Sequence, residues 1–128
     1  EVPVGCIIVL KNKIIAEAFN QPIMKHDPSA HAEIVALRLA GKLIKNYRLP
    51  GTVMYVTLEP CAMCIGAIIN ARVSKVFYGA SDPKFGACGS MLSIHENFKL
   101  NHHTAFKGGL LANESAELLR KFFKGRRK

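Results

Sequence analysis

Residues 52–70 read TVMYVTLEPCAMCIGAIIN, a stretch in which a strand pattern is followed directly by a helix pattern. Residues 52–59 follow the turn-forming pair Pro50-Gly51 and form an apolar run rich in β-branched residues, which predicts a buried strand. Residues 61–70 have almost no polar face and predict a helix buried on more than one side, against the sheet and against a second subunit. A buried strand that leads directly into such a helix indicates an α/β domain.

Further strands are predicted on both sides of this stretch. Residues 4–10 and 14–19 are short β-branched runs separated by residues 11–13, and they predict an antiparallel hairpin. Residues 72–80 and 102–108 predict two more strands. Together with the strand at 52–59, these runs predict a mixed five-stranded sheet flanked by helices, and therefore a layered α/β fold.

Two more helices complete the predicted fold. Residues 26–43 predict a helix capped by Asp27 or Ser29, with Pro28 at its first position, because apolar residues recur there at helical spacing. A final helix is expected to begin at Asn113. Its apolar face comprises Leu118, Leu119, Phe122 and Phe123.

The size and composition of the chain favour one globular domain over residues 1–128. No apolar stretch approaches the roughly 20 residues of a membrane span, so no membrane association is expected. The chain contains four cysteines, too few and too irregularly spaced for a secreted disulfide framework, which favours a cytoplasmic protein. The chain begins at Glu1 without a methionine and enters a strand almost at once, so we expect an N-terminal segment to be absent.

The net charge of +9 is concentrated in the second half of the chain. Residues 1–64 carry seven basic and five acidic side chains, whereas residues 65–128 carry eleven and four. The tail RKFFKGRRK, residues 120–128, has six basic side chains and no acidic one. A polyanionic partner such as a nucleic acid explains this asymmetry, and a solvated C-terminal helix explains it equally well.

Cys61 and Cys64 lie three residues apart at the start of the predicted helix, so both thiols face the same way. The preceding Pro60 suits a first helical turn, and the helix N-terminus favours thiolates. This spacing is compatible with a metal site or a redox pair. Met63, between the two thiols, is expected to pack in the core.

The sequence AHAEI, residues 30–34, is the candidate second half of the site. His31 and Glu33 both point toward a ligand off the helix end only if they lie in the first helical turn. His31 with the two thiolates makes three ligands, whereas a structural zinc site usually has four, so a catalytic zinc with one open position is favoured. Glu33 is then free to move protons. A structural zinc remains an alternative, with His26 as the candidate fourth ligand.

At this point the sequence resembles the zinc-dependent nucleoside deaminases, whose signature is H-x-E followed by P-C-x-x-C. Within that superfamily it is most similar to the bacterial tRNA adenosine deaminases, and the resemblance spans nearly the whole chain. The stretches that carry it are EVPVG (1–5), FNQPIMKHDPSAHAEI (19–34), TLEPCAMCIGAIINARV (57–73) and VFYGASDPKFGACGS (76–90).

The resemblance implies a three-layer cytidine-deaminase-like fold and a homodimer with one Zn²⁺ per subunit. It also implies hydrolytic conversion of adenosine to inosine at the wobble position of a tRNA anticodon stem-loop. His31, Cys61 and Cys64 correspond to the zinc ligands and Glu33 to the proton shuttle. By the same resemblance, the substrate-binding residues are Asn20, Ala32, Pro60 and Asp82.

Other assignments leave alternatives open. Asn20 and Asp82 each stand near a proline and are also common turn residues. Phe85 occupies a loop position where the family leads us to expect a smaller residue. The candidate RNA contacts are Lys84, Phe123, Arg126 and Arg127.

Two other functions compete with RNA editing. A deaminase of free bases or nucleosides, of the guanine or cytosine type, needs the same zinc and carboxylate, but it needs neither the basic tail nor the 81–90 loop. A non-catalytic, zinc-stabilised RNA-binding module predicts a fourth protein ligand. The family also carries a helix before the EVPVG stretch, and that helix is missing from this sequence.

Overall fold

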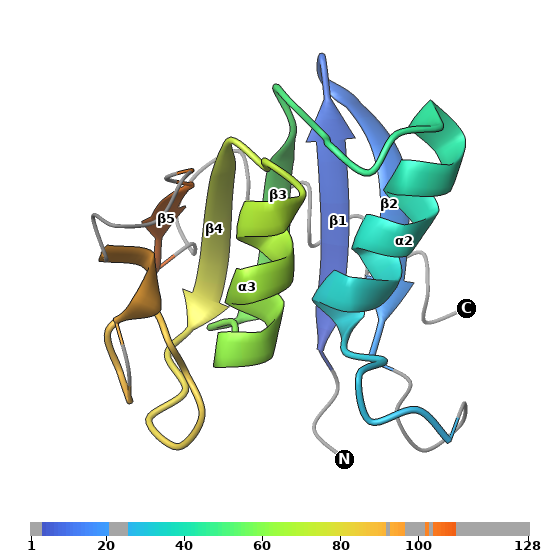
Figure 1. Cartoon of the computed structure of the whole chain (residues 1–128). Helices are drawn as coiled ribbons and strands as arrows, with labels where there is room; N and C mark the ends of the chain where they lie inside the picture. The colour runs from blue at the N-terminus through green and yellow to red at the C-terminus, as the bar shows by residue number, and fades with distance from the viewer. Residues whose placement is uncertain (1–3, 21–25, 92, 97–101, 103, 110–128) are drawn as a thin grey trace.

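A computed structural model describes residues 4–20, 26–91, 93–96, 102 and 104–109. Its core is a five-stranded sheet with strand order β2-β1-β3-β4-β5 (Figure 1). The elements are β1 (Gly5–Leu10), β2 (Lys13–Phe19), α2 (Ala32–Ile44), β3 (Val53–Leu58), α3 (Ala62–Asn70), β4 (Lys75–Ala80), the short 3₁₀ helix η1 (Ile94–Glu96) and β5 (Ala105–Lys107). The predicted mixed five-stranded α/β fold is confirmed.

The β1–β2 hairpin closes with a tight turn at Lys11 and Asn12. Both residues have positive φ angles, 50° and 65°, as a two-residue hairpin turn of type I′ requires. The strands pair antiparallel, with Leu10 opposite Lys13. The second strand therefore begins at Lys13, one residue earlier than the sequence predicts, because the turn needs only two residues.

The sheet is mixed because β1 pairs antiparallel with β2 and β3, whereas β3, β4 and β5 run parallel. Parallel neighbours need a long crossover connection, and α3 supplies the one between β3 and β4. The carboxyl ends of β3 and β4 thus point to one edge of the sheet. In open α/β sheets this is the edge where ligands bind.

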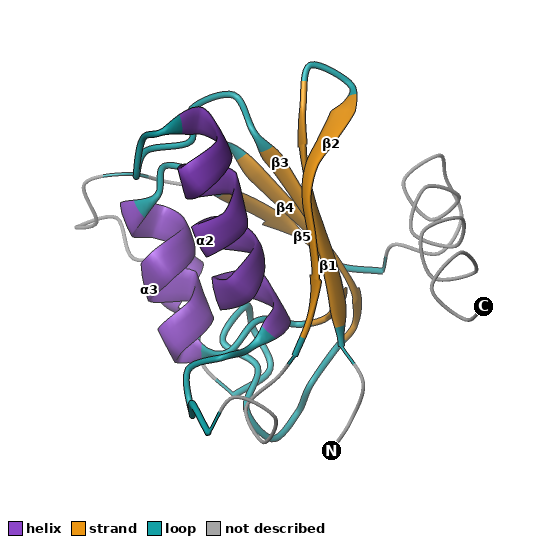
Figure 2. Cartoon of the chain, turned by 90° about the vertical axis from the view of Figure 1, so that its right-hand side faces the viewer, coloured by secondary structure: helices purple, strands orange, loops and turns teal. Residues whose placement is uncertain are grey.

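Helices α2 and α3 pack side by side on one face of the sheet (Figure 2). The core between these helices and the sheet includes the fully buried side chains of Cys6, Ile8, Met54 and Ile68. The opposite face has its own apolar cluster around Ile7, as expected from the alternation of side chains along a strand. The third layer stays a prediction, because the helix expected from Asn113 lies outside the described residues.

The predicted cap of α2 is wrong. The helix begins at Ala32, with His31 as its N-cap. The Asp27 carboxylate instead accepts hydrogen bonds from the Ser29 backbone N–H at 2.9 Å and from the Ser29 hydroxyl at 2.7 Å. These bonds stabilise a turn before the helix, so Pro28 is not helical, and the helix start is displaced onto His31.

Helix α3 is buried on one side within this chain. Its buried residues Cys64, Ile65, Ile68 and Ile69 form one face. Met63 lies on the other side with 41% of its surface exposed, so the prediction that it packs in the core is wrong. The helix packs against its own sheet through one face, and burial of its other side against a second subunit stays a prediction.

In the part of the chain that the structure describes, every helix is too short or too polar to cross a bilayer.

Candidate active site

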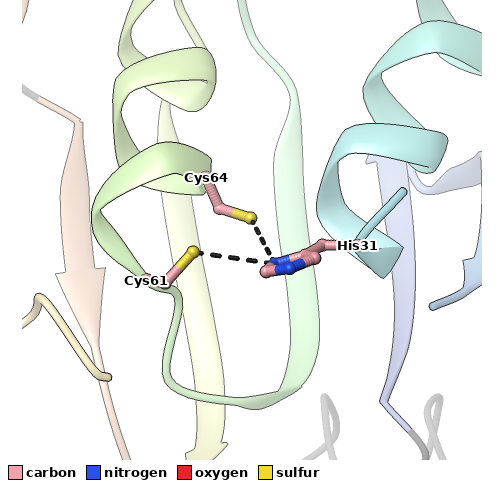
Figure 3. Close-up of side chains that lie close together, drawn as sticks. All are labelled: His31, Cys61 and Cys64. Carbon is pink, nitrogen blue, oxygen red and sulfur yellow. Dashed lines mark hydrogen bonds between the residues drawn. The ribbon is translucent and has the colours of Figure 1, made fainter. Parts of the chain in front are cut away.

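The starts of α2 and α3 meet beyond the carboxyl end of β3. His31 is the N-cap of α2 and Cys61 is the N-cap of α3, and both have extended backbone conformations. Neither side chain caps its own helix with a hydrogen bond. Both side chains, with Cys64 from the first turn of α3, therefore point into the space between the two helix ends (Figure 3).

The three donor atoms fit a zinc ion. The Nδ1 atom of His31 lies 3.6 Å from the sulfur of Cys61 and 3.5 Å from that of Cys64. All three donor atoms lie within 4.8 Å of one another. Tetrahedral zinc, with Zn–S near 2.3 Å and Zn–N near 2.0–2.1 Å, separates nitrogen from sulfur by about 3.6 Å. His31, Cys61 and Cys64 are therefore placed to bind one zinc ion, as expected from the sequence.

The set has three members within the described part of the chain: no further His, Cys, Asp or Glu joins the cluster there. His26, the candidate fourth ligand, is exposed on the surface. All four cysteines are free thiols, which disfavours a disulfide between Cys61 and Cys64. A site with three protein ligands has the donor count of catalytic zinc.

The two thiols share a hydrogen bond that makes them unequal. The hydrogen bond from Cys64 lowers the pKa of Cys61 to about 5. The same hydrogen bond, together with burial, raises the pKa of Cys64. A divalent cation removes this inequality, because its charge stabilises both thiolates.

Glu33 lies in the first turn of α2, next to the ligands and outside their set. Only 4% of its surface is exposed. Burial raises the pKa of its carboxyl from 4.5 to about 7, although its own backbone N–H favours the charged form. A carboxyl that titrates near neutral pH is suited both to accept and to donate a proton.

These groups line a cavity of about 380 Å³, within the range of small-ligand sites. Of the residues predicted to bind substrate, Asn20, Ala32 and Asp82 line it, whereas Pro60 does not. Pro60 is fully buried, and its carbonyl accepts a hydrogen bond from the Ala87 N–H at 2.9 Å. The complete lining is Val4, Asn20, His31, Ala32, Glu33, Leu58, Glu59, Cys61, Asp82 and Phe85.

Asn20 and Asp82 also shape the backbone that forms the cavity. The side-chain oxygen of Asn20 accepts a hydrogen bond from the Val4 N–H at 3.0 Å. The Oδ1 atom of Asp82 accepts hydrogen bonds from the N–H groups of Lys84, at 3.1 Å, and Phe85, at 3.3 Å. Asp82 therefore has the turn role considered above, whereas Asn20 links the end of β2 to Val4, 16 positions away, and both residues also line the cavity.

Of the predicted RNA contacts, only Lys84 can be placed. It is exposed on the loop that follows β4. Phe123, Arg126 and Arg127 lie outside the described residues.

Sequence reasoning missed Glu59, which anchors this loop. It is 3% exposed, and its carboxylate accepts hydrogen bonds from the N–H groups of Asp82 (3.1 Å), Cys88 (2.8 Å) and Ser90 (3.2 Å) and from the Ser90 hydroxyl. Burial opposes ionisation, but these four hydrogen bonds outweigh it and hold the pKa of Glu59 below 4.5. The only available signal was an acidic residue between a buried strand and Pro60.

Comparisons with known proteins agree with this geometry. Residues 1–80 match the cytidine and deoxycytidylate deaminase zinc-binding region. The tRNA-specific adenosine deaminase of Haemophilus influenzae is 47% identical over 128 residues, which cover 99% of this chain and 74% of that protein. The tRNA-specific adenosine deaminase of Bacillus subtilis is 40% identical and is covered over 80% of its length by the whole of this chain.

Solved structures show the same fold. A chain from structural studies of A-to-I editing by tRNA:A34 deaminases superposes with a TM-score of 0.82 at 41% identity, covering 85% of this chain and 84% of that one. Guanine deaminase from Bacillus subtilis superposes with a TM-score of 0.62 at 32% identity, covering 98% of this chain and 80% of that one. The metal ligands, the neighbouring carboxyl and these similarities lead to one assignment: the chain belongs to the cytidine and deoxycytidylate deaminase family and, within it, to the tRNA-specific adenosine deaminases.

Proposed function

We propose that this protein hydrolyses adenosine to inosine at the wobble position of a tRNA anticodon. The observation that carries the proposal is the buried Glu33 carboxyl, which lines the same cavity as His31 and Cys61 and lies outside the metal-binding set. The names of the relatives supply the substrate class. We also propose that residues 1–128 form a single deaminase domain.

His31, Cys61 and Cys64 would hold the zinc ion, with one ion per subunit. When bound by three protein ligands, zinc lowers the pKa of a water molecule to about 7 and so provides a nucleophile at neutral pH. Glu33 would accept one proton from the water and deliver it to the ring nitrogen, which keeps it. It would then carry the second proton, from the hydroxyl group on the attacked carbon, to the departing amine. The C–N bond breaks, a C=O bond forms, and ammonia leaves.

The remaining cavity residues hold the nucleotide. Ala32 frames the extruded base, and the side chain of Asn20 contacts the target nucleotide. Asp82 lines the cavity, and its carboxylate can accept a hydrogen bond from a ribose hydroxyl and so favour RNA over DNA. Pro60 is buried, so it supports the site without contacting the substrate.

The phosphate backbone contacts basic side chains outside the cavity. Lys84 is the candidate on the loop beside the cavity, and we propose Phe123, Arg126 and Arg127 as contacts from the basic tail. Such contacts position the strand and carry no sequence information of their own. We also propose a cytoplasmic location, because tRNA is the substrate.

We further propose that the active form is a homodimer that uses the exposed side of α3. An open groove of about 730 Å³ runs between α2 and α3 and includes Leu37, Tyr47, Met63 and Ala67. Met63 and Tyr47 expose 41% and 69% of their surfaces there. Exposed apolar side chains in one continuous groove are typical of a protein–protein contact.

The decisive experiment presents the zinc-loaded protein with an anticodon stem-loop that has an ACG anticodon and, separately, with free adenosine, cytidine and guanine. Mass spectrometry of the nucleosides is expected to show inosine from the stem-loop. Turnover of a free base or nucleoside with none in the stem-loop would instead identify a small-molecule deaminase.

A further inference from the structure

Phe85 is a large aromatic residue exposed at the mouth of the cavity. It exposes 61% of its surface and lines the same cavity as Glu33 and Asp82. An exposed phenyl ring gains little from the protein's own core, so the structure gives it no packing role. The ring therefore has an unoccupied surface at the place where a nucleic acid strand must approach the zinc ligands.

The loop holds the backbone of Phe85 in a defined position. The Asp82 carboxylate accepts the N–H of Phe85 at 3.3 Å, and the Asp82 carbonyl accepts the N–H of Gly86 at 2.8 Å. Gly86 packs against Glu59 so closely that a Cβ atom there would lie 2.4 Å from the carboxyl carbon of Glu59. The backbone on both sides of Phe85 is thus fixed, so a ligand that contacts the ring has to order only the side chain.

A cation accompanies the ring. The ammonium group of Lys84 lies 5.9 Å from the ring centroid, near the outer limit of a cation–π contact. At this distance the ammonium is held weakly and can turn to a phosphate. An aromatic ring beside a mobile positive charge is the combination that proteins use to bind single-stranded nucleic acids.

We propose that Phe85 stacks on the base of a nucleotide that flanks the target adenosine. This inference rests on the proposed function, since only a polynucleotide has a flanking base. A free nucleoside has no flanking base to stack on the ring, so Phe85 makes the enzyme favour RNA over small substrates. Contact of the ring with a protein partner is the competing explanation.

Fluorescence tests the stacking directly, because the chain contains no tryptophan. In zinc-loaded Phe85→Trp, the indole is the only one present and is expected to be quenched when the stem-loop is added. Free adenosine is expected to leave the emission unchanged. The matched control is Leu43→Trp, in which a residue 63% exposed at the far end of α2 is replaced, and its emission is expected not to respond.

Kinetics provide the second measurement. Base–aromatic stacking corresponds to about a 5- to 150-fold effect on binding. Phe85→Ala and Phe85→Leu are therefore expected to raise KM for the stem-loop within this range while kcat changes little, and Phe85→Tyr is expected to restore it. Phe85→Leu keeps an apolar side chain, so a purely hydrophobic protein contact would leave it close to the wild type.

The outcomes separate the two proposals. If the wild type makes inosine in the stem-loop and KM of both Phe85→Ala and Phe85→Leu stays within about twofold of the wild type, the stacking inference is wrong and the function stands. If the emission of Phe85→Trp does not change on adding the stem-loop although the variant still edits it, the stacking inference is likewise wrong and the function stands. A wild type that makes no inosine in the stem-loop overturns both.

Discussion

Replacing Glu59 by glutamine tests the claim that one buried carboxylate organises the loop after β4. Each of the two carboxylate oxygens accepts two hydrogen bonds. Oε1 accepts from the Asp82 N–H and the Ser90 hydroxyl, and Oε2 accepts from the N–H groups of Cys88 and Ser90. Glutamine has nearly the same shape but replaces one oxygen with a donor group. With the amide nitrogen in place of Oε2, the N–H groups of Cys88 and Ser90 lose their acceptor. With it in place of Oε1, the Asp82 N–H loses its acceptor and the Ser90 hydroxyl has to turn and accept instead. Either way, two hydrogen bonds to a charged oxygen are lost.

The expected loss of stability follows from this count. A hydrogen bond to a charged group contributes about 1.5–3 kcal/mol to stability, so two of them contribute about 3–6 kcal/mol. Domains of this kind are stable by only about 5–15 kcal/mol in total. We therefore expect the free energy of unfolding of Glu59→Gln to fall by about 3 kcal/mol or more, unless the loop opens locally and limits the loss.

The assay is urea unfolding of the zinc-loaded protein, followed by circular dichroism. Glu96→Gln is the control, because Glu96 is exposed and its ion pair is a 3.7 Å contact with His95. That variant should stay within about 0.5 kcal/mol of the wild type. Zinc content should be unchanged in Glu59→Gln, since the ligands come from α2 and α3, whereas KM for the stem-loop should rise because Asp82 and Phe85 lose their support.

Two results would refute this reasoning. If Glu59→Gln unfolds within about 0.5 kcal/mol of Glu96→Gln with an unchanged KM, the carboxylate does not organise the loop. The pH dependence gives an independent check. Because the pKa of Glu59 lies below 4.5 in the folded state, its stabilisation is complete above about pH 4.5 and is lost as the pH falls through the folded pKa. Glu59→Gln should therefore lose less stability than the wild type in that acidic range.

Four further predictions address the metal site and the core. Glu33→Gln should keep zinc and RNA affinity and lose at least about 10²–10⁴-fold in inosine formation, and inosine at the normal rate would contradict the mechanism. Since burial raises the pKa of Glu33 from 4.5 to about 7, the same variant without zinc should gain up to about 3 kcal/mol of stability at pH 8 by urea unfolding, and the gain should shrink as the pH falls toward 4.5. Chelation of zinc, or Cys64→Ser, should abolish activity and lower the melting temperature, with zinc restoring only the chelated wild type; full stability after verified metal loss would show that the ion is not linked to folding. Ile68→Ala should cost about 2–5 kcal/mol because Ile68 is fully buried, whereas Leu43→Ala, at an exposed position, should change stability by less than about 0.5 kcal/mol; equal losses in urea unfolding would show that burial does not set the cost.

Several features of the site could be predicted from short stretches of sequence. The strand pattern at 52–59, followed by Pro60, predicted a helix start at Cys61. The three-residue spacing then predicted that the thiols of Cys61 and Cys64 face the same way. The ligand types indicated zinc with an open position, and their separations in the structure agree with that. These features are local, because they depend on helical geometry and on donor chemistry within a few residues.

Other predictions were wrong because a distant or competing interaction determined the structure at those residues. Asp27 reads as a helix cap, but it binds Ser29 in a turn. Met63 reads as a core residue, but the sheet lies on the other side of α3. Apolar character and capping propensity set only what a residue is able to do, whereas the neighbours that the fold supplies determine which option is realised.

By itself, the sequence determined the fold class, the metal donors and the acidic residue beside them, because strand and helix periods and ligand chemistry are properties of short segments. The tertiary structure alone decided that Glu59 binds the loop around Ser90, 31 residues away, and that Phe85 remains exposed at the mouth of the cavity. Burial and hydrogen bonding depend on which distant segments meet. On the surface, the Glu59 carboxylate would be hydrated by water. In the core, the Phe85 ring would pack against other apolar side chains.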